Sequence, residues 1–300
     1  MKNQQNWLIT GASGLLGHDL CRQLISKGKN VAALKSTHQV GVKGAEEFCI
    51  DITDEASVKS IIKNRAPDVI VHAAGLTNVD ECEKKPYLAH SIHVDGTRYI
   101  AEIAQECGVQ LVYISTDHLW DGSQPMVDEE EPTNPINVYA KTKLEGELAA
   151  LTVCSQSLSI RTNFFGPGRP WRTSFSDWIL KSLVLKSEIS MFADVYYTPI
   201  STKLLCQNIN ELVAKNAMGI FNVGGSERLS KYQFALRLAK AANYCADTVG
   251  QTSLSSHALK APRPHDMSLD TEKVSAFLGR TMPSIDESIS SLGLSKFSNI

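Results

Sequence analysis

The stretch from Leu8 to Gly17, LITGASGLLG, constrains the fold of this chain more than any other. A short apolar run breaks into glycines spaced Gly-x-x-Gly-x-x-Gly, and leucines then recur at helical intervals. The pattern predicts a buried strand, a tight turn at Gly11 and a helix. In such a turn Gly14 lets the backbone approach a pyrophosphate, Gly17 lets the helix pack against the sheet, and the first N–H groups of the helix face the anion.

Strand and helix patterns alternate along the first half of the chain. Short apolar strands are expected at residues 7–10, 30–34, 46–50, 69–72, 110–115 and 158–161. Helices are expected between them, at 15–25, 55–64, 87–107 and from about 137. This alternation predicts an α/β fold of the Rossmann type, a doubly wound parallel sheet with helices on both faces. Ligands of such sheets bind beyond the carboxyl ends of the strands.

The regular alternation ends after Arg161. A cluster of helix-breaking residues, GPGRP at 166–170, is followed by helical patterns at 175–186, 204–215, 230–244 and 285–292 and a strand at 219–223. We therefore expect a dinucleotide-binding Rossmann domain over residues 1–161. Residues 162–300 are expected to form mainly a small α/β lobe that binds the substrate, with some segments returning to the Rossmann domain.

Composition limits the class of protein. A net charge of −2 gives no general attraction to nucleic acid or to an anionic membrane. The first residues lack the apolar run of a signal peptide, and nowhere do about 18 apolar residues follow one another, so we expect a cytoplasmic protein. The seven scattered cysteines form no Cys-x-x-Cys pair, which predicts reduced, mostly buried thiols and no metal site.

The ends of the second and third predicted strands bear on the choice of cofactor. No Asp or Glu occurs from residue 31 to 40 to accept a hydrogen bond from an adenosine 2′-hydroxyl. Lys35 could instead meet a 2′-phosphate, which favours NADP over NAD, and a solvated surface lysine is the alternative. Asp51 either binds the adenine amino group or forms a turn before a helix capped by Asp54.

Three residues form a candidate catalytic set. Tyr139 and Lys143 are four residues apart on one predicted helix, so their side chains lie one turn apart on the same face. An ammonium group beside a phenol favours the phenolate and brings the pKa of the tyrosine closer to neutrality, so that it can exchange a proton with a substrate oxygen. Thr116, at the end of the preceding strand, offers a hydroxyl to the same oxygen. Together with the glycine turn, this order of residues favours a common active site over a chance combination.

These motifs are part of a wider resemblance that covers most of the chain. It includes residues 10–17, DITD at 51–54, HAAGLTNVD at 72–80 with Glu83, residues 115–122, YAKTK at 139–143 with Gly146 and Glu147, Pro199, and Arg263-Pro264 followed by Leu269-Asp270. On these residues the sequence resembles the extended short-chain dehydrogenase/reductases, and among them the dTDP-4-dehydrorhamnose reductases. The resemblance implies NAD(P)H-dependent reduction of the keto group of a nucleotide-linked 4-keto-6-deoxy sugar, for the biosynthesis of carbohydrate precursors.

The resemblance also implies roles for individual residues. Tyr139 would protonate the substrate oxygen, Lys143 would assist it and hold the nicotinamide ribose, and Thr116 would stabilise the developing alkoxide. The implied cofactor site adds to Tyr139 and Lys143 the residues Gly11, Ser13, Gly14, Leu15, Leu16, Gly17, Lys35, Asp51, Ile52, Ala73, Ala74, Gly75 and Thr77. The implied substrate site comprises Thr77, Asp80, Asp117, His118, Asn163, Trp171 and Arg263. A homodimer is an assembly that the resemblance allows.

Several residues depart from the family pattern. His93 stands where an Asn that ties down the active-site backbone is usual, and His118 replaces a Tyr. Trp120 replaces a Phe, and Ala140 replaces the Gly that often follows the catalytic Tyr. These changes leave the reaction type intact and leave the particular sugar open.

Some alternatives stay open. Epimerases and dehydratases of nucleotide sugars use the same three residues with a retained cofactor. The regulatory subunit of methionine adenosyltransferase resembles the same reductases but serves a partner enzyme.

Among single residues, His72 is expected to be a hydrogen-bonded core histidine. Four arginines either clamp a substrate diphosphate or have structural roles, namely Arg161, Arg169, Arg172 and Arg263.

Overall fold

The computed structural model describes residues 5–293, which divide into two compact units. The first unit runs up to Leu119 and includes Pro135–Arg161 and Lys215–Ile220. The second unit comprises Trp120–Asn134, Thr162–Ala214 and the chain from Phe221 onwards.

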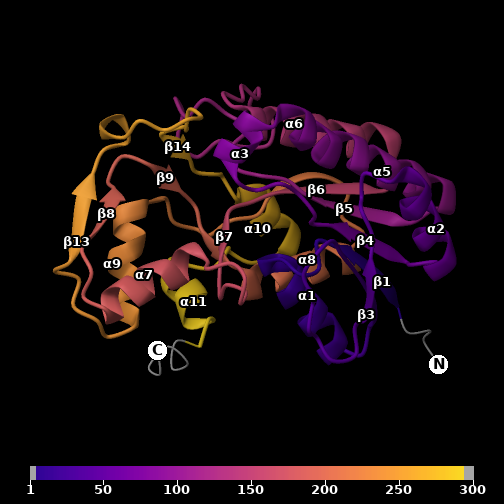
Figure 1. Ribbon diagram of the computed structural model, residues 1–300, viewed down its shortest axis with the longest axis horizontal. Helices are drawn as coiled ribbons and strands as arrows, with labels where there is room; N and C mark the ends of the chain where they lie inside the picture. The colour runs from indigo at the N-terminus through magenta and orange to yellow at the C-terminus, as the bar shows by residue number, and fades with distance from the viewer. Residues whose placement is uncertain (1–4, 294–300) are drawn as a thin grey trace. The chain divides into compact units, whose positions relative to one another are not determined.

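The first unit is built on a seven-stranded sheet with the order β11-β6-β5-β4-β1-β2-β3 (Figure 1). All neighbours from β6 to β3 pair in parallel. Because β2 and β4 lie on opposite sides of β1, the strand order reverses at β1, where sheets of this kind bind ligands. The predicted doubly wound α/β fold is thus confirmed. The strands are β1 (Asn6–Thr10), β2 (Asn30–Lys35), β3 (Glu46–Cys49), β4 (Val69–His72), β5 (Gln110–Ile114), β6 (Ser157–Arg161) and β11 (Gly219–Asn222).

Helices of the first unit pack on this sheet with a shared apolar core. Helix α5 packs between α2 and α6 (Figure 1). Side chains of these three helices interlock with those of β1, β2, β4 and β5, among them Leu8, Ile70 and Ile100. Asp54 caps α2 as predicted, since its side chain accepts from the N–H groups of Ala56 and Ser57. The helices are α1 (Leu15–Ser26), α2 (Glu55–Arg65), α3 (Val79–Lys84), α4 (Pro86–His90), the π-helix η1 (Ser91–Asp95), α5 (Gly96–Cys107) and α6 (Val138–Val153).

The long helix predicted over residues 87–107 is confirmed, because α4, η1 and α5 follow one another without a break from Pro86 to Cys107. The prediction misses the π-turn inside this helix. Helix α4 ends at His90, the π-helix follows, and α5 begins only at Gly96. The wider π-turn buries His93, whose ring nitrogens bond to two other segments of the unit. The spacing of apolar residues does not predict such a turn, because the turn is stabilised by the polar contacts of His93.

The second unit carries short strands in small sheets around its own core. In these sheets β7 (Phe164–Phe165) pairs with β10 (Ile200–Ser201), β8 (Ile189–Phe192) with β13 (Val249–Thr252), and β9 (Tyr196–Tyr197) with both β12 (Leu229–Ser230) and β14 (Asp266–Met267). Phe165 and Tyr197 pack edge-on against Phe234 in the core. The helices are α7 (Phe175–Val184), α8 (Thr202–Ala214), α9 (Lys231–Ala241), α10 (Glu272–Leu278), α11 (Ile285–Ser290) and the 3₁₀ turn η2 (Leu254–Ser256).

Two expectations from composition concern the whole described chain. No helix within residues 5–293 is both long enough and apolar enough to cross a membrane. The seven cysteines all lie in this part of the chain and form no disulfide. Three of them, Cys49, Cys107 and Cys245, are exposed, and the other four are buried.

Candidate active site

The glycine turn joins β1 to α1 beside the end of β4. Gly11 has a φ of +64°, a left-handed conformation that favours glycine. A Cβ atom on Gly11 would lie 2.7 Å from backbone atoms of Ala73 and Ala74. Because no side chain fits between these backbones, the turn packs directly on the end of β4.

The two later glycines of the turn lie in different surroundings. Gly14 is exposed, donates its N–H to the Gly11 carbonyl at 2.9 Å and is the N-cap of α1. Gly17 is buried, and a Cβ atom on it would overlap the Gly11 carbonyl oxygen and the Cα of Ala12. The expected contact of Gly17 with the sheet is therefore corrected to a contact with the turn, because the first turn of α1 folds back onto Gly11. Three more predicted cofactor residues complete this segment, the half-buried Ser13 and Leu15 and the buried Leu16.

Lys35 and Asp51 follow neighbouring strands of the sheet. Lys35 is half-buried at the end of β2, and its carbonyl accepts from the N–H of Ile50 at 2.9 Å. Asp51 is exposed, and its Oδ1 accepts from the N–H and the hydroxyl of Thr53 at 2.9 and 2.8 Å. These bonds agree with the turn-forming interpretation of Asp51. Contacts of Lys35, Asp51 and the buried Ile52 with a nucleotide stay predictions.

The loop after β4 brings further predicted residues to the same edge of the sheet. The N–H of Leu76 donates to Nε2 of His93 at 2.9 Å. Gly75 is exposed, and a Cβ atom on it would lie 3.3 Å from the same Nε2. Thr77 is exposed, and Asp80 is half-buried in the first turn of α3.

Thr116, Asp117 and His118 follow the end of β5. Thr116 and Asp117 are buried, and the Thr116 hydroxyl donates to Oδ1 of Asp117 at 3.3 Å. The same hydroxyl oxygen accepts from the N–H of His118, also at 3.3 Å. The His118 ring lies edge-on to the Tyr139 ring, with centroids 5.6 Å apart. The structure therefore brings this strand end together with Tyr139.

The first turn of α6, which carries Tyr139, is fixed by polar contacts. Asn137 is the N-cap, and its side chain accepts from the N–H of Ala140 at 2.9 Å. Glu83, from α3, accepts from the N–H of Val138 at 3.0 Å. Two N–H groups that a helix start leaves without intrahelical partners are thus satisfied. The contact of Glu83 joins segments far apart in the sequence, so no local pattern predicts it.

Lys143 lies in a buried and partly aromatic environment. Its Nζ donates to the carbonyl of Ile114 at 2.8 Å and lies 4.1 Å from the centroid of the Tyr113 ring. The Tyr113 hydroxyl in turn donates to the Lys143 carbonyl at 3.1 Å. Burial lowers the pKa of Lys143 from 10.5 to about 7, and the charge of Glu147 raises it in part. Burial thus favours the neutral amine of Lys143, and the charge of Glu147 favours the ammonium.

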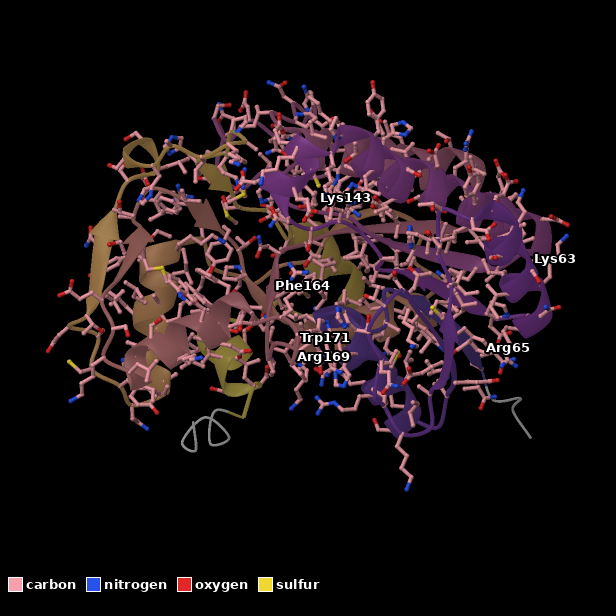
Figure 2. All side chains as sticks on the ribbon, viewed as in Figure 1. Lys63, Arg65, Lys143, Phe164, Arg169 and Trp171 are labelled. Carbon is pink, nitrogen blue, oxygen red and sulfur yellow. The ribbon has the colours of Figure 1, made fainter. Side chains whose placement is uncertain are left out.

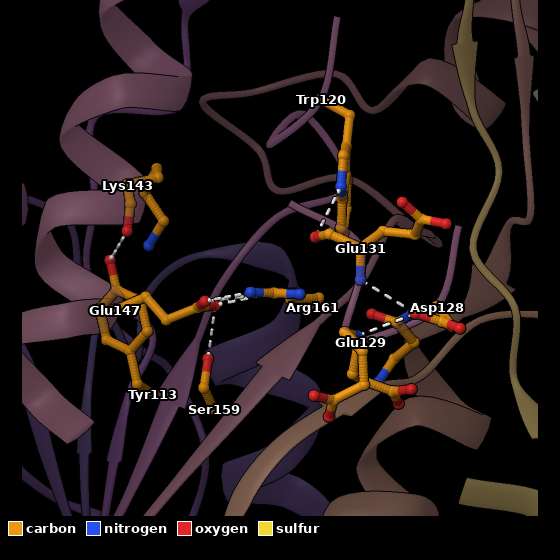
Figure 3. A network of polar contacts seen from close by, with 11 residues as sticks. Tyr113, Trp120, Asp128, Glu129, Glu131, Lys143, Glu147, Ser159 and Arg161 are labelled. Atoms are coloured by element: carbon orange, nitrogen blue, oxygen red, sulfur yellow. Dashed lines mark hydrogen bonds and ion pairs between the residues drawn. The ribbon is translucent and has the colours of Figure 1, made fainter. Parts of the chain in front are cut away.

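Glu147, one turn after Lys143, anchors α6 to strand β6. Its carboxylate accepts from Nε and Nη2 of Arg161 and from the hydroxyl of Ser159 (Figure 3). Both charged side chains are almost fully buried. Of the two interpretations of Arg161, the structure supports the structural one, since its guanidinium is engaged by Glu147.

Buried hydrogen bonds also join the glycine turn to α6. His72 bonds to the hydroxyls of Thr10 and Thr97, which confirms the expected core histidine. Thr97 donates to the carbonyl of His93, and Nδ1 of His93 lies 2.8 Å from the Thr142 hydroxyl. Thr142 belongs to the YAKTK motif, whereas Thr97 lies in no quoted motif, and a polar residue on a buried helix face is the one signal that could have found it.

The remaining predicted residues lie in the second unit. The carbonyl of Asn163 accepts from the N–H of Ile200 at 3.1 Å. Trp171 lies beside Arg169, whose guanidinium carbon is 5.0 Å from the indole centroid (Figure 2). Arg263 donates from Nη1 to the carbonyl of Ala261 at 2.9 Å. A direct role of these residues in binding substrate stays a prediction.

Similarity to known proteins extends over most of the chain. The dTDP-4-dehydrorhamnose reductase of Salmonella typhimurium is 31% identical over 279 residues, which cover 89% of this chain and 90% of that protein. Methionine adenosyltransferase 2 subunit beta of Xenopus laevis is 28% identical over 283 residues, with coverage of 89% and 80%. A crystal structure of dTDP-4-dehydrorhamnose reductase from Bacillus anthracis in complex with NADP matches with a TM-score of 0.86 at 27% identity, covering 97% of this chain and 99% of that one.

A single family description spans both units. The model of the RmlD substrate binding domain matches residues 5–293, from the first strand to the end of the described chain. The chain therefore belongs to the RmlD substrate-binding domain family of extended short-chain dehydrogenase/reductases.

Proposed function

We propose that this chain is an NADPH-dependent reductase of a dTDP-linked 4-keto-6-deoxy sugar. The observation that carries the proposal is the attachment of α6 to the end of β5, where Lys143 bonds to Ile114 and Tyr139 packs against His118. A phenol, an ammonium group and the Thr116 hydroxyl are the groups that a carbonyl reduction needs. The names of the reductases of Salmonella typhimurium and Bacillus anthracis support the same substrate class.

The glycine turn fits the pyrophosphate of a dinucleotide. Gly14 lies exposed at the N-terminus of α1, a helix of 12 residues, and makes no side-chain cap. Outside its neighbours in the chain, a Cβ atom on Gly14 would contact only the Gly11 carbonyl oxygen, at 3.2 Å, so little packs against this glycine at the start of the helix. When bound, NADPH supplies the hydride. The residues proposed to hold it are Gly11, Ser13, Gly14, Leu15, Leu16, Gly17, Lys35, Asp51, Ile52, Ala73, Ala74, Gly75, Thr77, Tyr139 and Lys143.

Tyr139 is the proposed proton donor. As the carbonyl carbon receives the hydride, its oxygen gains an electron pair and takes the phenol proton, so that an alcohol forms and Tyr139 is left as the phenolate. The Lys143 ammonium favours that phenolate electrostatically. Thr116 donates a hydrogen bond to the oxygen while it carries negative charge.

The proposed substrate contacts offer several kinds of chemistry. Thr77, Asp80, Asp117 and His118 belong to the first unit and offer polar groups to the sugar. In the second unit, Arg263 suits a diphosphate and Trp171 suits a nucleobase, because a guanidinium pairs with phosphate oxygens and an indole stacks on planar rings. Asn163 completes the proposed set. A homodimeric assembly and a cytoplasmic site of action stay predictions.

A regulatory subunit is the second candidate, favoured by the similarity to methionine adenosyltransferase 2 subunit beta. Such a protein would bind NADPH without reducing a sugar. The candidate catalytic groups Thr116, Tyr139 and Lys143 favour the enzyme, because a binding module has no need of them.

The test is to incubate the purified protein with NADPH and a panel of dTDP- and UDP-linked 4-keto sugars while following cofactor absorbance. Consumption of NADPH with the dTDP-linked 4-keto-6-deoxy sugar, and formation of the alcohol by mass spectrometry, are the expected results. NADPH binding without turnover of any sugar would favour the regulatory subunit. Nucleotide that co-purifies and sugar products formed without net NADPH consumption would favour an epimerase or dehydratase.

A further inference from the structure

His93 lies in the π-helix η1. It lies in the middle of Ser91–Asp95 and its side chain is buried, in a helix whose other turns are regular. π-turns cost regular helical hydrogen bonds and occur frequently at functional sites. The two glycines nearest to His93 leave room for it: a Cβ on Gly75 would lie 3.3 Å from its Nε2, and one on Gly146 would overlap its carbonyl oxygen.

The hydrogen bonds of the His93 ring have defined directions. The N–H of Leu76 donates to Nε2 at 2.9 Å, so Nε2 carries no proton. Nδ1 lies 2.8 Å from the hydroxyl of Thr142, and that hydroxyl donates to the carbonyl of Val138 at 2.8 Å. Nδ1 therefore carries the ring proton and donates it to Thr142. The imidazole joins the loop after β4 to helix α6 by one accepted and one donated bond.

The bridge ends at the turn of α6 that carries Tyr139. The Thr142 hydroxyl also lies 3.1 Å from the Tyr139 carbonyl, and the His93 ring packs edge-on against the Tyr139 ring with centroids 5.8 Å apart. The position of His93 is itself held, because Thr97 donates to its carbonyl at 2.6 Å and accepts from His72. Rotation or shift of this part of α6 would break the bridge.

We infer that His93 is a positioning residue, which sets Tyr139 relative to the loop after β4 by bridging Leu76 and Thr142. The inference rests on the proposed role of Tyr139 as proton donor. Burial and the nearby Lys143 hold the pKa of His93 at about 3, so that the ring stays neutral and keeps both bonds at physiological pH. Nε2 can accept the hydrogen bond of the Leu76 N–H only while the ring is neutral.

Substitution of Thr142 tests the bridge with the smallest change. Thr142→Val removes the acceptor of the His93 Nδ1–H, and a small displacement of Tyr139 is expected to lower kcat about 10- to 100-fold. Proton transfer then limits the rate more strongly, so the solvent deuterium isotope effect on kcat increases. Thr142→Ser keeps the hydroxyl and is expected to stay within about threefold of the parent in kcat.

Thr152→Val is the matched control. Thr152 lies on the same helix and its hydroxyl donates to the Leu148 carbonyl at 2.7 Å, which repeats the Thr142 to Val138 bond without a histidine. Kinetics of Thr152→Val should equal those of the parent. If Thr142→Val kept the kcat and the isotope effect of the parent, or if Thr142→Ser lost as much as Thr142→Val, the inference would be overturned.

The ring of His93 gives a readout that needs no substrate. In ¹⁵N NMR of the parent at pH 7, Nδ1 of His93 should be protonated and Nε2 unprotonated, and His93→Gln serves to assign the signals. Observation of the opposite tautomer would overturn the inference whatever the activity is. If Tyr139→Phe kept full turnover while the tautomer and the Thr142 results were as expected, the proposed role of Tyr139 would fail and the bridge itself would stand.

Discussion

The Glu147 carboxylate and the Arg161 guanidinium form a buried ion pair between helix α6 and strand β6, with Nη2 2.7 Å from Oε1. Ser159 donates a third hydrogen bond to the same carboxylate at 2.8 Å. Glu147 follows Lys143 by one helical turn. The ion pair with Arg161 therefore fixes the turn of α6 that comes directly after Lys143. It also places a negative charge that raises the pKa of Lys143 against the effect of burial.

Removal of one partner of this pair should be strongly destabilising. Arg161→Met leaves the Glu147 carboxylate buried without its cation, and the expected loss is about 3–5 kcal/mol in the free energy of unfolding. Urea denaturation measures it. The control is Lys85→Met, which breaks the exposed pair with Glu81 and should cost less than about 1 kcal/mol. A loss in Arg161→Met no larger than in the control would show that water reaches Glu147.

Tyr139→Phe should abolish proton donation while leaving the fold intact. The ring contacts with His93 and His118 need no hydroxyl, so the thermal unfolding temperature should stay close to that of the parent. We expect kcat to fall by about two to four orders of magnitude, as removal of a general acid implies. Steady-state assay with the dTDP-linked 4-keto sugar measures it, and turnover within tenfold of the parent would contradict the proposed role.

Most of this fold could be predicted because its signals are local. Strand β4 and the start of α2 come from short apolar runs and from the Asp54 cap, and the glycine turn is readable from its spacing. The π-helix around His93 could not be predicted, since bonds to Leu76 and to α6 hold it and these join segments distant in sequence.

The same reason limits what the sequence says of the site. Tyr139 and Lys143 can be identified from the sequence, because they are four residues apart on one predicted helix. The partner of Arg161 cannot be identified in this way, because an arginine that ends a strand fits either a diphosphate or a carboxylate on a neighbouring helix. Only the packing of α6 decides between them. A strand of two residues, such as β9, is too short to show an alternation of apolar and polar residues.

Acid should destabilise the first unit through His72 and His93. Burial lowers the pKa of each ring from 6.5 to about 3, so the folded state keeps both neutral while the unfolded chain binds protons below 6.5. Stability is therefore fully present above about pH 6.5 and falls as pH decreases towards 3, by up to about 1.4 kcal/mol per pH unit for each histidine. Urea denaturation between pH 7 and pH 5 measures the slope, and His93→Gln should show a shallower one. Equal slopes in parent and variant would contradict the prediction.

His118→Tyr should change which sugar is preferred. His118 is mostly buried, its Nε2 lies 3.9 Å from Oδ1 of Asp117, and its ring packs on Tyr139, so a substitution at this position changes the surroundings of the proposed proton donor. An imidazole can donate or accept where a phenol offers one hydroxyl. We expect relative kcat/KM values among dTDP- and UDP-linked 4-keto sugars to shift while NADPH affinity stays the same. An unchanged ranking would assign His118 to support of Tyr139 alone.

Cofactor choice is predicted from the end of β2. Lys35 is half-buried there, and no carboxylate occurs from residue 31 to 40 to accept from a ribose 2′-hydroxyl. An ammonium beside a 2′-phosphate near the surface contributes up to about 1 kcal/mol, so NADPH should be preferred over NADH by up to about fivefold. Separate titrations with the two nucleotides, followed by tryptophan fluorescence, measure the ratio.

Lys35→Asp should reverse this order, because a carboxylate repels the 2′-phosphate and accepts from the 2′-hydroxyl of NADH. Lys29→Asp is the matched control, since Lys29 precedes the same strand at its other end and donates to Gln5 at 3.0 Å. In the parent, raising the salt concentration above about 0.1 M should shrink the NADPH preference, because charges are then screened beyond about 10 Å. A preference for NADH in the parent, or the same ratio in the parent and Lys35→Asp, would show that Lys35 does not meet the nucleotide.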